Sequence, residues 1–226
     1  MLARADTSVD APAWWPDWRG RPCVIIASGP SSKQFDVSAF RGHFRVIAIK
    51  EAAFHLAPWA EVAYGCDLAW WKYRRGLDRF GGLKIGWDRR IASLFPDVRT
   101  IEIRLKARPD KYVDDLLFDR CGEIGCGGNS GFQAFNLALQ FGVTKVALVG
   151  FDMHDRSGKH WYGRNTWARA NNPDSENFRR WRSSFDRAAY VCRMRGIAVV
   201  TLSSISDLSC FRRQTTSRLL AEWMIR

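Results

Sequence analysis

The clearest structural signal in this chain of 226 residues lies in two neighbouring stretches, CGGNSGFQA at residues 126–134 and KVALVGFD at residues 145–152. They predict a glycine-rich turn, an amphipathic helix, a buried strand and an acidic residue, Asp152, at the carboxyl end of that strand. A helix that begins in glycines presents unpaired backbone N–H groups and a positive dipole end, which suits a phosphate. Ligands of open α/β sheets bind outside the carboxyl ends of the strands. Together the two stretches predict a site for a nucleotide or a nucleotide-sugar.

Strand and helix patterns alternate on both sides of these stretches. The apolar run at 21–28 is typical of a central parallel strand that is covered on both faces. The alternation predicts a Rossmann-like, doubly wound α/β fold with a mostly parallel sheet and helices on both faces. Further strands are expected at 44–50, 61–66, 83–87, 100–105, 145–150 and 197–202, with 100–105 at an edge. Helices are expected at 35–40, 68–73, 132–141, 177–195 and 217–225.

The chain is expected to form an N-terminal arm, residues 1–20, followed by one nucleotide-binding, transferase-like α/β domain, residues 21–226. The arm carries Trp14, Trp15 and Trp18 among prolines and aspartates, and these rings should pin it to the body or to a neighbour. Residues 152–172 are polar and show neither helical nor strand periodicity. A loop of this length in a compact domain is usually functional or mobile, so we expect 152–176 to be a mobile lid.

Composition narrows the class of protein. Six scattered cysteines indicate reduced thiols in a cytoplasm rather than a disulfide framework. Cys121 and Cys126 lack the second Cys or His pair that zinc needs, so no metal is expected. The chain has no run of about 18 apolar residues that would form a membrane span, and its start lacks the pattern of a signal peptide. We therefore expect a cytoplasmic protein without a membrane partner.

The net charge of +12 is concentrated near the carboxyl end, where residues 156–226 hold fourteen Lys and Arg against five Asp and Glu. Arginine pairs with phosphate in a bidentate fork, so one interpretation is a polyanionic partner such as nucleic acid. The other is a solvated helix face in which arginine replaces lysine. Under the first interpretation, the residues predicted to contact the acceptor or nucleic acid are Arg164, Trp167, Arg179, Arg180 and Arg182.

The nucleotide is expected between the turn after the first strand and the glycine-rich helix start. The turn has neither the G-x-G-x-x-G nor the Walker A pattern, so signatures of hydride transfer and P-loop kinase chemistry are missing. Asp67 and Asp152 each follow a strand end and could hold a ribose hydroxyl or cap a helix; capping is favoured for Asp67 and ligand binding for Asp152. The glycine density at 127–131 exceeds what capping needs, which favours ligand contact. The predicted nucleotide-binding residues are Ser28, Gly29, Pro30, Ser31, Asp67, Gly128, Asn129, Ser130, Gly131 and Asp152.

Candidates for chemistry lie in the polar loop. His154 and His160 are accompanied by Lys159 and by aromatic residues. Histidine can donate to a departing phosphate or accept a proton from an acceptor hydroxyl near neutral pH. An isolated loop histidine is usually inert, but two of them beside a nucleotide site favour a catalytic role for His154, His160 and Lys159.

Several of these motifs resemble a known family. The strand and turn VIIASGPS at 24–31, the Ser130-Gly131 helix start and VGFD at 149–152 are similar to the bacterial sialyltransferases of glycosyltransferase family 42 and to related hydroxymethylpterin diphosphokinase-like domains. The motifs YGCD at 64–67, GNSG at 128–131 and GKHW at 158–161 also resemble uncharacterised phage and prophage proteins. The likeness covers roughly residues 21–205.

The resemblance implies that the first turn and the helix start bind a cytidine nucleotide, through Ser28, Gly29, Pro30, Ser130 and Gly131. It also implies that His154 and His160 stand near the positions of two family tyrosines that steady the departing phosphate, and that catalysis needs no metal. Two departures are visible: Ser28 replaces a family asparagine, and residues 171–178 lack the family's general-base histidine.

The leading hypothesis is a phage-type, metal-independent glycosyltransferase in the cytoplasm of an infected host. Its co-substrate would be a cytidine- or uridine-type nucleotide-sugar, with no permanently bound cofactor, and its acceptor a hydroxymethylated base in phage DNA. One alternative is a non-catalytic nucleic-acid-binding or phage morphogenesis protein. The other is a pterin-type diphosphotransferase, which would need ATP and Mg²⁺.

Overall fold

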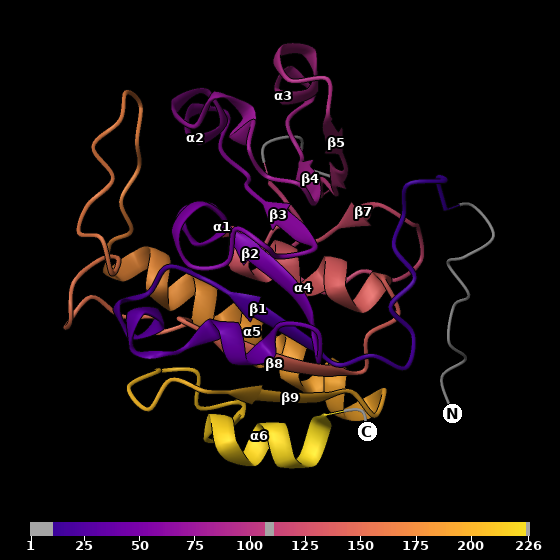
Figure 1. Ribbon diagram of the computed structural model, residues 1–226, viewed down its shortest axis with the longest axis vertical. Helices are drawn as coiled ribbons and strands as arrows, with labels where there is room; N and C mark the ends of the chain where they lie inside the picture. Colours follow the sequence, from indigo (N-terminus) through magenta and orange to yellow (C-terminus); the bar gives the residue numbers. More distant parts are fainter. Residues whose placement is uncertain (1–10, 107–110, 225–226) are drawn as a thin grey trace.

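The central feature of the molecule is one parallel β-sheet, seen in a computed structural model that describes residues 11–106 and 111–224 (Figure 1). Within these residues the sheet has eight strands in the order β10-β9-β8-β1-β2-β3-β4-β5, and every pair is parallel. The predicted Rossmann-like α/β class is confirmed. The strands are β1 (Cys23–Ile26), β2 (Arg45–Ile49), β3 (Val62–Tyr64), β4 (Leu83–Gly86), β5 (Val98–Thr100), β8 (Lys145–Val149), β9 (Ala198–Thr201) and β10 (Arg212–Arg213).

The direction in which strands are added reverses at β1. The chain places β2, β3, β4 and β5 successively on one side of β1, and it later places β8, β9 and β10 on the other side. Connections that leave β1 and β8 therefore diverge to opposite faces of the sheet, and a crevice opens at their carboxyl ends. This is where the sequence predicts the ligand.

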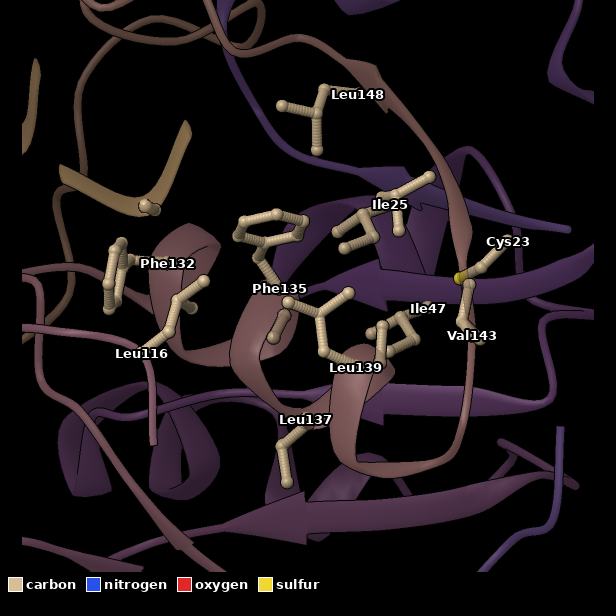
Figure 2. Packing of buried hydrophobic residues seen from close by; sticks show 14 of the residues in the cluster. Cys23, Ile25, Ile47, Leu116, Phe132, Phe135, Leu137, Leu139, Val143 and Leu148 are labelled. Carbon is tan, nitrogen blue, oxygen red and sulfur yellow. The ribbon is translucent and has the colours of Figure 1, made fainter. Parts of the chain in front are cut away.

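Helices cover both faces of the sheet. Side chains alternate along β1, so Cys23 and Ile25 belong to one core cluster and Val24 and Ile26 to the other. The first cluster includes α4 and α5, and Figure 2 shows Phe135 of α4 packed toward Ile25. The second includes side chains of α1, α2, α3 and α6. The helices are α1 (Glu51–His55), α2 (Leu68–Tyr73), α3 (Arg89–Leu94), α4 (Ser130–Gln140), α5 (Ser175–Met194) and α6 (Thr216–Trp223), with 3₁₀ turns η2 (Pro30–Gln34), η3 (Val37–Phe40) and η4 (Arg75–Leu77).

Helix α4 is buried on all sides, whereas the sequence predicts an amphipathic helix. Its polar residues satisfy the backbone of the segment 116–125, which covers the face expected to meet solvent. The Asn136 side chain accepts from the N–H groups of Leu117 and Gly125, both at 3.0 Å, and donates to the Leu117 carbonyl at 2.8 Å. Gln140 donates to the carbonyl of Glu123 at 2.8 Å. The polar stripe of this helix thus serves an internal contact.

Two further expectations change in detail. The predicted edge strand at 100–105 is divided, because Val98–Thr100 pairs with β4 whereas β6 (Glu102–Ile103) pairs with β7 (Glu123–Ile124) in a separate two-stranded sheet. The predicted helix at 35–40 is instead the single 3₁₀ turn η3, capped by Asp36, which accepts from Ser38 N–H at 3.0 Å. Within the described residues, no helix is long and apolar enough to cross a bilayer.

The N-terminal arm predicted for residues 1–20 is described only from residue 11 onward, and residues 1–10 lie outside the described part of the chain. The Trp15 and Trp18 rings both pack edge-on against Phe141, with centroids 4.8 and 4.9 Å away. Trp18 N–H also donates to the Phe141 carbonyl at 2.7 Å. The tryptophans therefore hold the described part of the arm against the end of α4.

Candidate active site

A cleft of about 200 Å³ lies at the carboxyl ends of β1, β2, β3 and β8, beside the amino end of α4. It therefore coincides with the reversal of strand order at β1. The structure brings most of the predicted site residues to this one place, although they come from four segments. Those that line it are Ser28, Gly29, Asp67, Gly128, Asn129, Ser130, Gly131, Asp152, His154, Lys159 and His160.

The amino end of α4 faces this cleft. Asn129 is the N-cap, and its Oδ1 accepts from Phe132 N–H at 2.9 Å. The N–H groups of Ser130 and Gly131 belong to the first turn, where an α-helix offers no internal acceptor. Ser130 Oγ donates to Cys66 Sγ at 3.0 Å and accepts from Cys66 N–H at 3.3 Å, which joins the helix start to the end of β3. The helix end thus presents amide donors and a positive dipole to the cleft.

The glycines before and within this helix start are explained by packing, whereas the sequence interpretation attributes their density to ligand contact. A Cβ on Gly127 would lie 2.1 Å from the Phe132 ring, and one on Gly131 would lie 2.7 Å from the Phe151 ring. Gly128 has a φ of +79°, in the left-handed region that favours glycine. Glycine density here therefore reflects close internal contacts, although Gly128 and Gly131 also line the cleft.

Lys50 is the cationic group that the sequence analysis missed. It follows β2 directly, lines the cleft with a side chain that is 18% exposed, and donates to the Asp67 carboxylate. Burial lowers the pKa of Lys50, but the charges of Cys66 and Asp67 outweigh burial and hold that pKa above its ordinary value. Its backbone has a φ of +49° and a ψ of −118°, a conformation that is strained for any residue with a side chain.

Asp67 differs from its predicted capping role. It occupies the N-cap position of α2, but its side chain makes no capping hydrogen bond and accepts from Lys50 instead. The positive charge of Lys50 lowers the pKa of Asp67, so this carboxylate is ionised at neutral pH. Its side chain is 47% exposed. The cleft therefore contains the Lys50–Asp67 ion pair, and its acidic member is accessible to a ligand.

Asp152 lies at the predicted place, but its carboxylate has internal partners instead of being open to a ribose. It is 2% exposed, and it accepts from Ser31 N–H at 2.8 Å, from Ser31 Oγ and from Ser203 Oγ at 2.8 Å. These bonds join the turns after β1, β8 and β9. Asp152 is thus a positioning residue. The predicted ligands Pro30 and Ser31 do not line the cleft, because they form the first 3₁₀ turn that Asp152 holds.

Gly29 permits the close approach of the β1 and β8 ends. Its N–H donates to the Gly150 carbonyl at 2.9 Å, so this amide is already used and does not face a phosphate as predicted. An added Cβ would lie 2.4 Å from that carbonyl oxygen and 2.8 Å from Asp152 Oδ2.

We expect Gly29→Ala to lower the free energy of unfolding by about 1–3 kcal/mol, because neither neighbour is a flexible side-chain end that can move aside cheaply. Gly81→Ala is the matched control, since a Cβ there meets nothing within 4 Å, and it should change stability by no more than about 0.5 kcal/mol. Urea unfolding of the two variants measures both values. Equal stability of the two would show that the β1–β8 contact is looser than described.

His154 is not available for phosphate chemistry, contrary to the prediction. Its ring is 6% exposed, with Nε2 2.8 Å from the Ile205 carbonyl and Nδ1 accepting from Arg156 N–H at 3.2 Å. A carbonyl can only accept, so Nε2 carries the proton and Nδ1 has the lone pair. Both nitrogens are therefore used, and His154 anchors the start of the loop to the segment after β9.

His160 is the histidine that remains a chemical candidate. Its ring stacks on Tyr162 with centroids 5.0 Å apart and an interplanar angle of 11°. Burial and the nearby positive charge of Lys50 lower its pKa to about 4, so the ring is neutral at pH 7. Among the described residues, His160 Nε2 is buried and has no hydrogen-bond partner. It can therefore exchange a proton or hydrogen bond with a ligand once the loop admits one.

The depressed pKa of His160 makes stability depend on pH. Between the ordinary value of 6.5 and about 4, the unfolded chain takes up a proton that the folded chain does not. The contribution of His160 to stability is therefore present above pH 6.5 and is lost as the pH falls toward 4. Chemical unfolding at about pH 7 and at about pH 4.5 should show that the free energy of unfolding falls less for His160→Gln than for wild type. A His43→Gln control, at an exposed position, should keep the wild-type loss; identical slopes for all three proteins would contradict the assignment.

Tyr162 and Lys159 complete the loop side of the cleft. Tyr162 OH donates to Asn165 Oδ1 at 2.8 Å, and burial raises its pKa to about 12, so it remains a phenol that can donate a hydrogen bond. Lys159 is paired with Asp155. The sequence did not predict Tyr162 as a site residue. It lies in an aromatic run, two residues beyond His160, and the structure brings it to the cleft.

Two of the four arginines predicted to clamp nucleic acid have internal partners. Arg180 contacts Asp114 at 2.9 Å, and Arg182 donates to the Met153 carbonyl at 2.7 Å. Trp167, predicted as a wedge, stacks on Tyr73 with centroids 5.0 Å apart. The two remaining members of the predicted set, Arg164 and Arg179, are exposed and do not line the cleft.

Other cleft residues could not be singled out from their sequence pattern. Trp181 of α5 lines the cleft and donates its indole N–H to the Gly128 carbonyl at 2.9 Å. Cys66 also lines it, and burial raises the pKa of its thiol to about 11. Lys50 was recognisable in principle, since it directly follows an apolar strand, and Asp152 likewise comes shortly after one. In residues 11–106 and 111–224, no three His, Cys, Asp or Glu side chains form a group that could hold a metal ion.

Comparison with known proteins identifies structural neighbours. The chain matches no protein-family model, and no curated protein matches it by sequence. Its structure is similar to that of the sialyltransferase CstII from Campylobacter jejuni in complex with a substrate analogue, cytidine-5'-monophosphate. The TM-score is 0.55 at 12% identity over 87% of this chain and 86% of that one. It is also similar to the sialyltransferase CST-II in complex with a trisaccharide acceptor and CMP, with a TM-score of 0.52 at 13% identity over 86% of each chain.

A further neighbour is the MAf glycosyltransferase from Magnetospirillum magneticum AMB-1, with a TM-score of 0.54 at 18% identity. That match covers 94% of this chain but 37% of the other. At these identities the likenesses establish a fold shared with sialyltransferase and glycosyltransferase structures.

Proposed function

We propose that this protein is a glycosyltransferase that uses a nucleotide-activated sugar and stabilises the departing phosphate without a metal. The observation that carries the proposal is the meeting of the α4 amino end and Lys50 in one cleft, at the reversal of strand order. Two of the structural neighbours that share this fold were solved with CMP, which supports a cytidine-type donor. A uridine-type donor is the alternative.

The phosphate of the donor would lie against the first-turn N–H groups of Ser130 and Gly131, with Lys50 as the neutralising cation. Amide donors aimed into a partly desolvated cleft stabilise charge that develops on a leaving phosphate, and they need no reorganisation to do so. Lys50 would exchange its contact with Asp67 for the phosphate, so Asp67 becomes available to the sugar or ribose hydroxyls. Ser28 and Gly29 would form the wall beside the nucleoside.

Residues of the loop would act on the bond between the sugar and the phosphate. Tyr162 would donate a hydrogen bond from its phenol O–H to the leaving phosphate, in exchange for its bond to Asn165. The neutral ring of His160 would accept a hydrogen bond through its unpartnered Nε2. We propose that residues 152–176 act as a lid that closes over the donor, because a closed lid excludes water and limits hydrolysis.

Isothermal titration calorimetry with CMP, CMP-sialic acid, UMP and UDP-sugars tests the donor site, each with and without EDTA. We expect one nucleotide family to bind with an affinity that EDTA does not change. Absence of binding by every member of the panel overturns the proposal. A requirement for magnesium with release of AMP from ATP would instead establish the pterin-type diphosphotransferase activity.

The acceptor is a separate question. The hydroxymethylated DNA base and the phage origin expected from the sequence remain hypotheses, and the internal partners of Arg180, Arg182 and Trp167 weaken the clamp and wedge on which a DNA acceptor depends. Transfer of radiolabelled sugar to hydroxymethylated DNA would establish that acceptor. Salt-sensitive DNA binding with no nucleotide binding would establish the non-catalytic alternative.

A further inference from the structure

A continuous row of rings extends from the cleft to the surface beside α2. It begins at Tyr162 in the cleft, whose ring centroid is 5.1 Å from that of Trp161, and Trp161 lies 5.5 Å from His55. At the outer end, Tyr73 stacks on Trp167. Figure 1 shows the loop that carries Trp167 as the orange segment rising beside α2. We give the name aromatic row to the part of this set beyond Tyr162, with the arginine packed between its rings: Trp161, His55, Phe54, Arg74, Tyr73 and Trp167.

The middle of the row is held rigidly by a buried carboxylate. Glu51 is 3% exposed and accepts from Trp70 Nε1 at 2.8 Å and from Arg74 Nε at 2.9 Å. The Arg74 guanidinium therefore stays in place, 3.9 Å from the centroid of the Phe54 ring and 4.7 Å from that of Tyr73. A guanidinium packed between two rings keeps both in a fixed orientation.

The backbone of the turn after α2 is strained, which indicates that contacts with its surroundings fix its conformation. Arg75, Gly76 and Leu77 have φ values of 51°, 72° and 56°, three consecutive residues in the left-handed region. Strain of this kind persists where surrounding contacts determine the backbone. Here the 6%-exposed side chain of Lys84 donates to the carbonyls of Gly76 at 3.2 Å and Leu77 at 3.3 Å.

The row remains open to solvent although it is held in place. Tyr73 is 50% exposed and Phe54 43% exposed. The exposed charges on the two segments that carry its outer end are mainly positive. Among the described residues, the exposed cations on these two segments form no ion pair with an acidic side chain. These cations are Lys72, Arg75, Arg79, Arg164 and Arg169.

We propose that the aromatic row is the acceptor-binding surface and that it takes an acidic oligosaccharide; this inference rests on the proposed function. Exposed aromatic rings present flat apolar faces against which sugar rings can lie, and the surrounding cations match carboxylate or sulfate groups. Contact with Tyr162 makes the row continuous with the cleft, so a bound chain would extend from the reacting hydroxyl outward. A nucleic acid chain fits less well, because Arg180 and Arg182 are already engaged.

A glycan array with neutral and acidic oligosaccharides, followed by fluorescence titration of the strongest ligand, tests this inference. We expect an acidic oligosaccharide to bind, and Tyr73→Ala and Trp167→Ala each to weaken that binding by about tenfold, or about 1.4 kcal/mol, because each variant removes one ring face. Nucleotide affinity of Tyr73→Ala, which lies outside the proposed lid, should stay within about twofold of wild type, which calorimetry measures. Tyr190→Ala is the matched control, because Tyr190 is 59% exposed on α5 and outside the row.

Three outcomes would overturn the proposal: no glycan binds, the two variants retain full glycan affinity, or only an oligothymidine of about ten nucleotides binds. Trp167→Phe should keep most of the glycan affinity, because it retains an aromatic ring at this position. This variant therefore distinguishes the loss of stacking from a change in the loop conformation. Failure of the proposed function is distinguishable, since glycan binding to the row without any nucleotide binding would leave a carbohydrate-binding surface and no transferase.

Discussion

Lys50→Met should lower the affinity for the donor nucleotide and the value of kcat/KM by about 100-fold or more, the largest functional effect that we expect. Lys50 is the cleft cation that stands beside the α4 amino end, and its side chain is 18% exposed, so water screens it weakly. Its removal also leaves the Asp67 carboxylate in the cleft without its partner, and that charge would repel a phosphate.

The comparison that isolates this effect uses two further variants. Lys145→Met removes a positive charge of the same kind from an exposed position at the start of β8, and it should leave donor affinity within about twofold of wild type. Lys50→Met with Asp67→Asn should recover part of the lost affinity, because the unpaired carboxylate is gone. Calorimetry with the bound nucleotide gives all three values. Equal affinity of Lys50→Met and wild type would remove Lys50 from the donor site.

Asp152→Ala should lower the free energy of unfolding by about 3–4 kcal/mol, the largest stability effect that we expect. The variant leaves the Ser31 N–H and two hydroxyl groups without their acceptor, at a place that is 2% exposed. It also releases the turn after β1 from the turn after β8, so donor affinity should fall as a consequence.

Urea unfolding with Asp78→Ala as the control distinguishes this role from ligand binding. Asp78 is exposed, and its replacement should change stability by no more than about 0.5 kcal/mol. If Asp152 acted as a ribose ligand alone, Asp152→Ala would lose nucleotide affinity while its stability stayed within about 1 kcal/mol of wild type. That result would return Asp152 to the ligand role that the sequence suggested.

The sheet and its ligand-binding edge could be predicted because they depend on local patterns. Continuous apolar runs at 21–28 and 145–150 indicate strands buried on both faces, and the small residues after each run indicate turns at the carboxyl end. Asn129 predicts its helix start for the same reason, since capping involves residues only three positions apart. These signals do not require knowledge of what lies across the molecule.

The roles of individual polar residues were less predictable. The partners of Asp152, Ser31 and Ser203, are 121 and 51 residues away in sequence, and the Nε2 partner of His154 is 51 residues away. Sequence position shows that such residues are near the cleft but not that their polar atoms are occupied. The same applies to Arg180, whose acidic partner Asp114 lies 66 residues earlier.

Apolar periodicity and turn chemistry in this chain were enough to establish an α/β sheet with a ligand edge, since each arises from residues close together along the backbone. Which polar groups at that edge remain free for chemistry depended on tertiary contacts. Folding consumes the hydrogen-bonding capacity of Asp152 and His154 and leaves Lys50, Asp67 and His160 facing the cleft. The physical reason is that a buried polar atom must find a partner, and only the folded chain determines which partner is within reach.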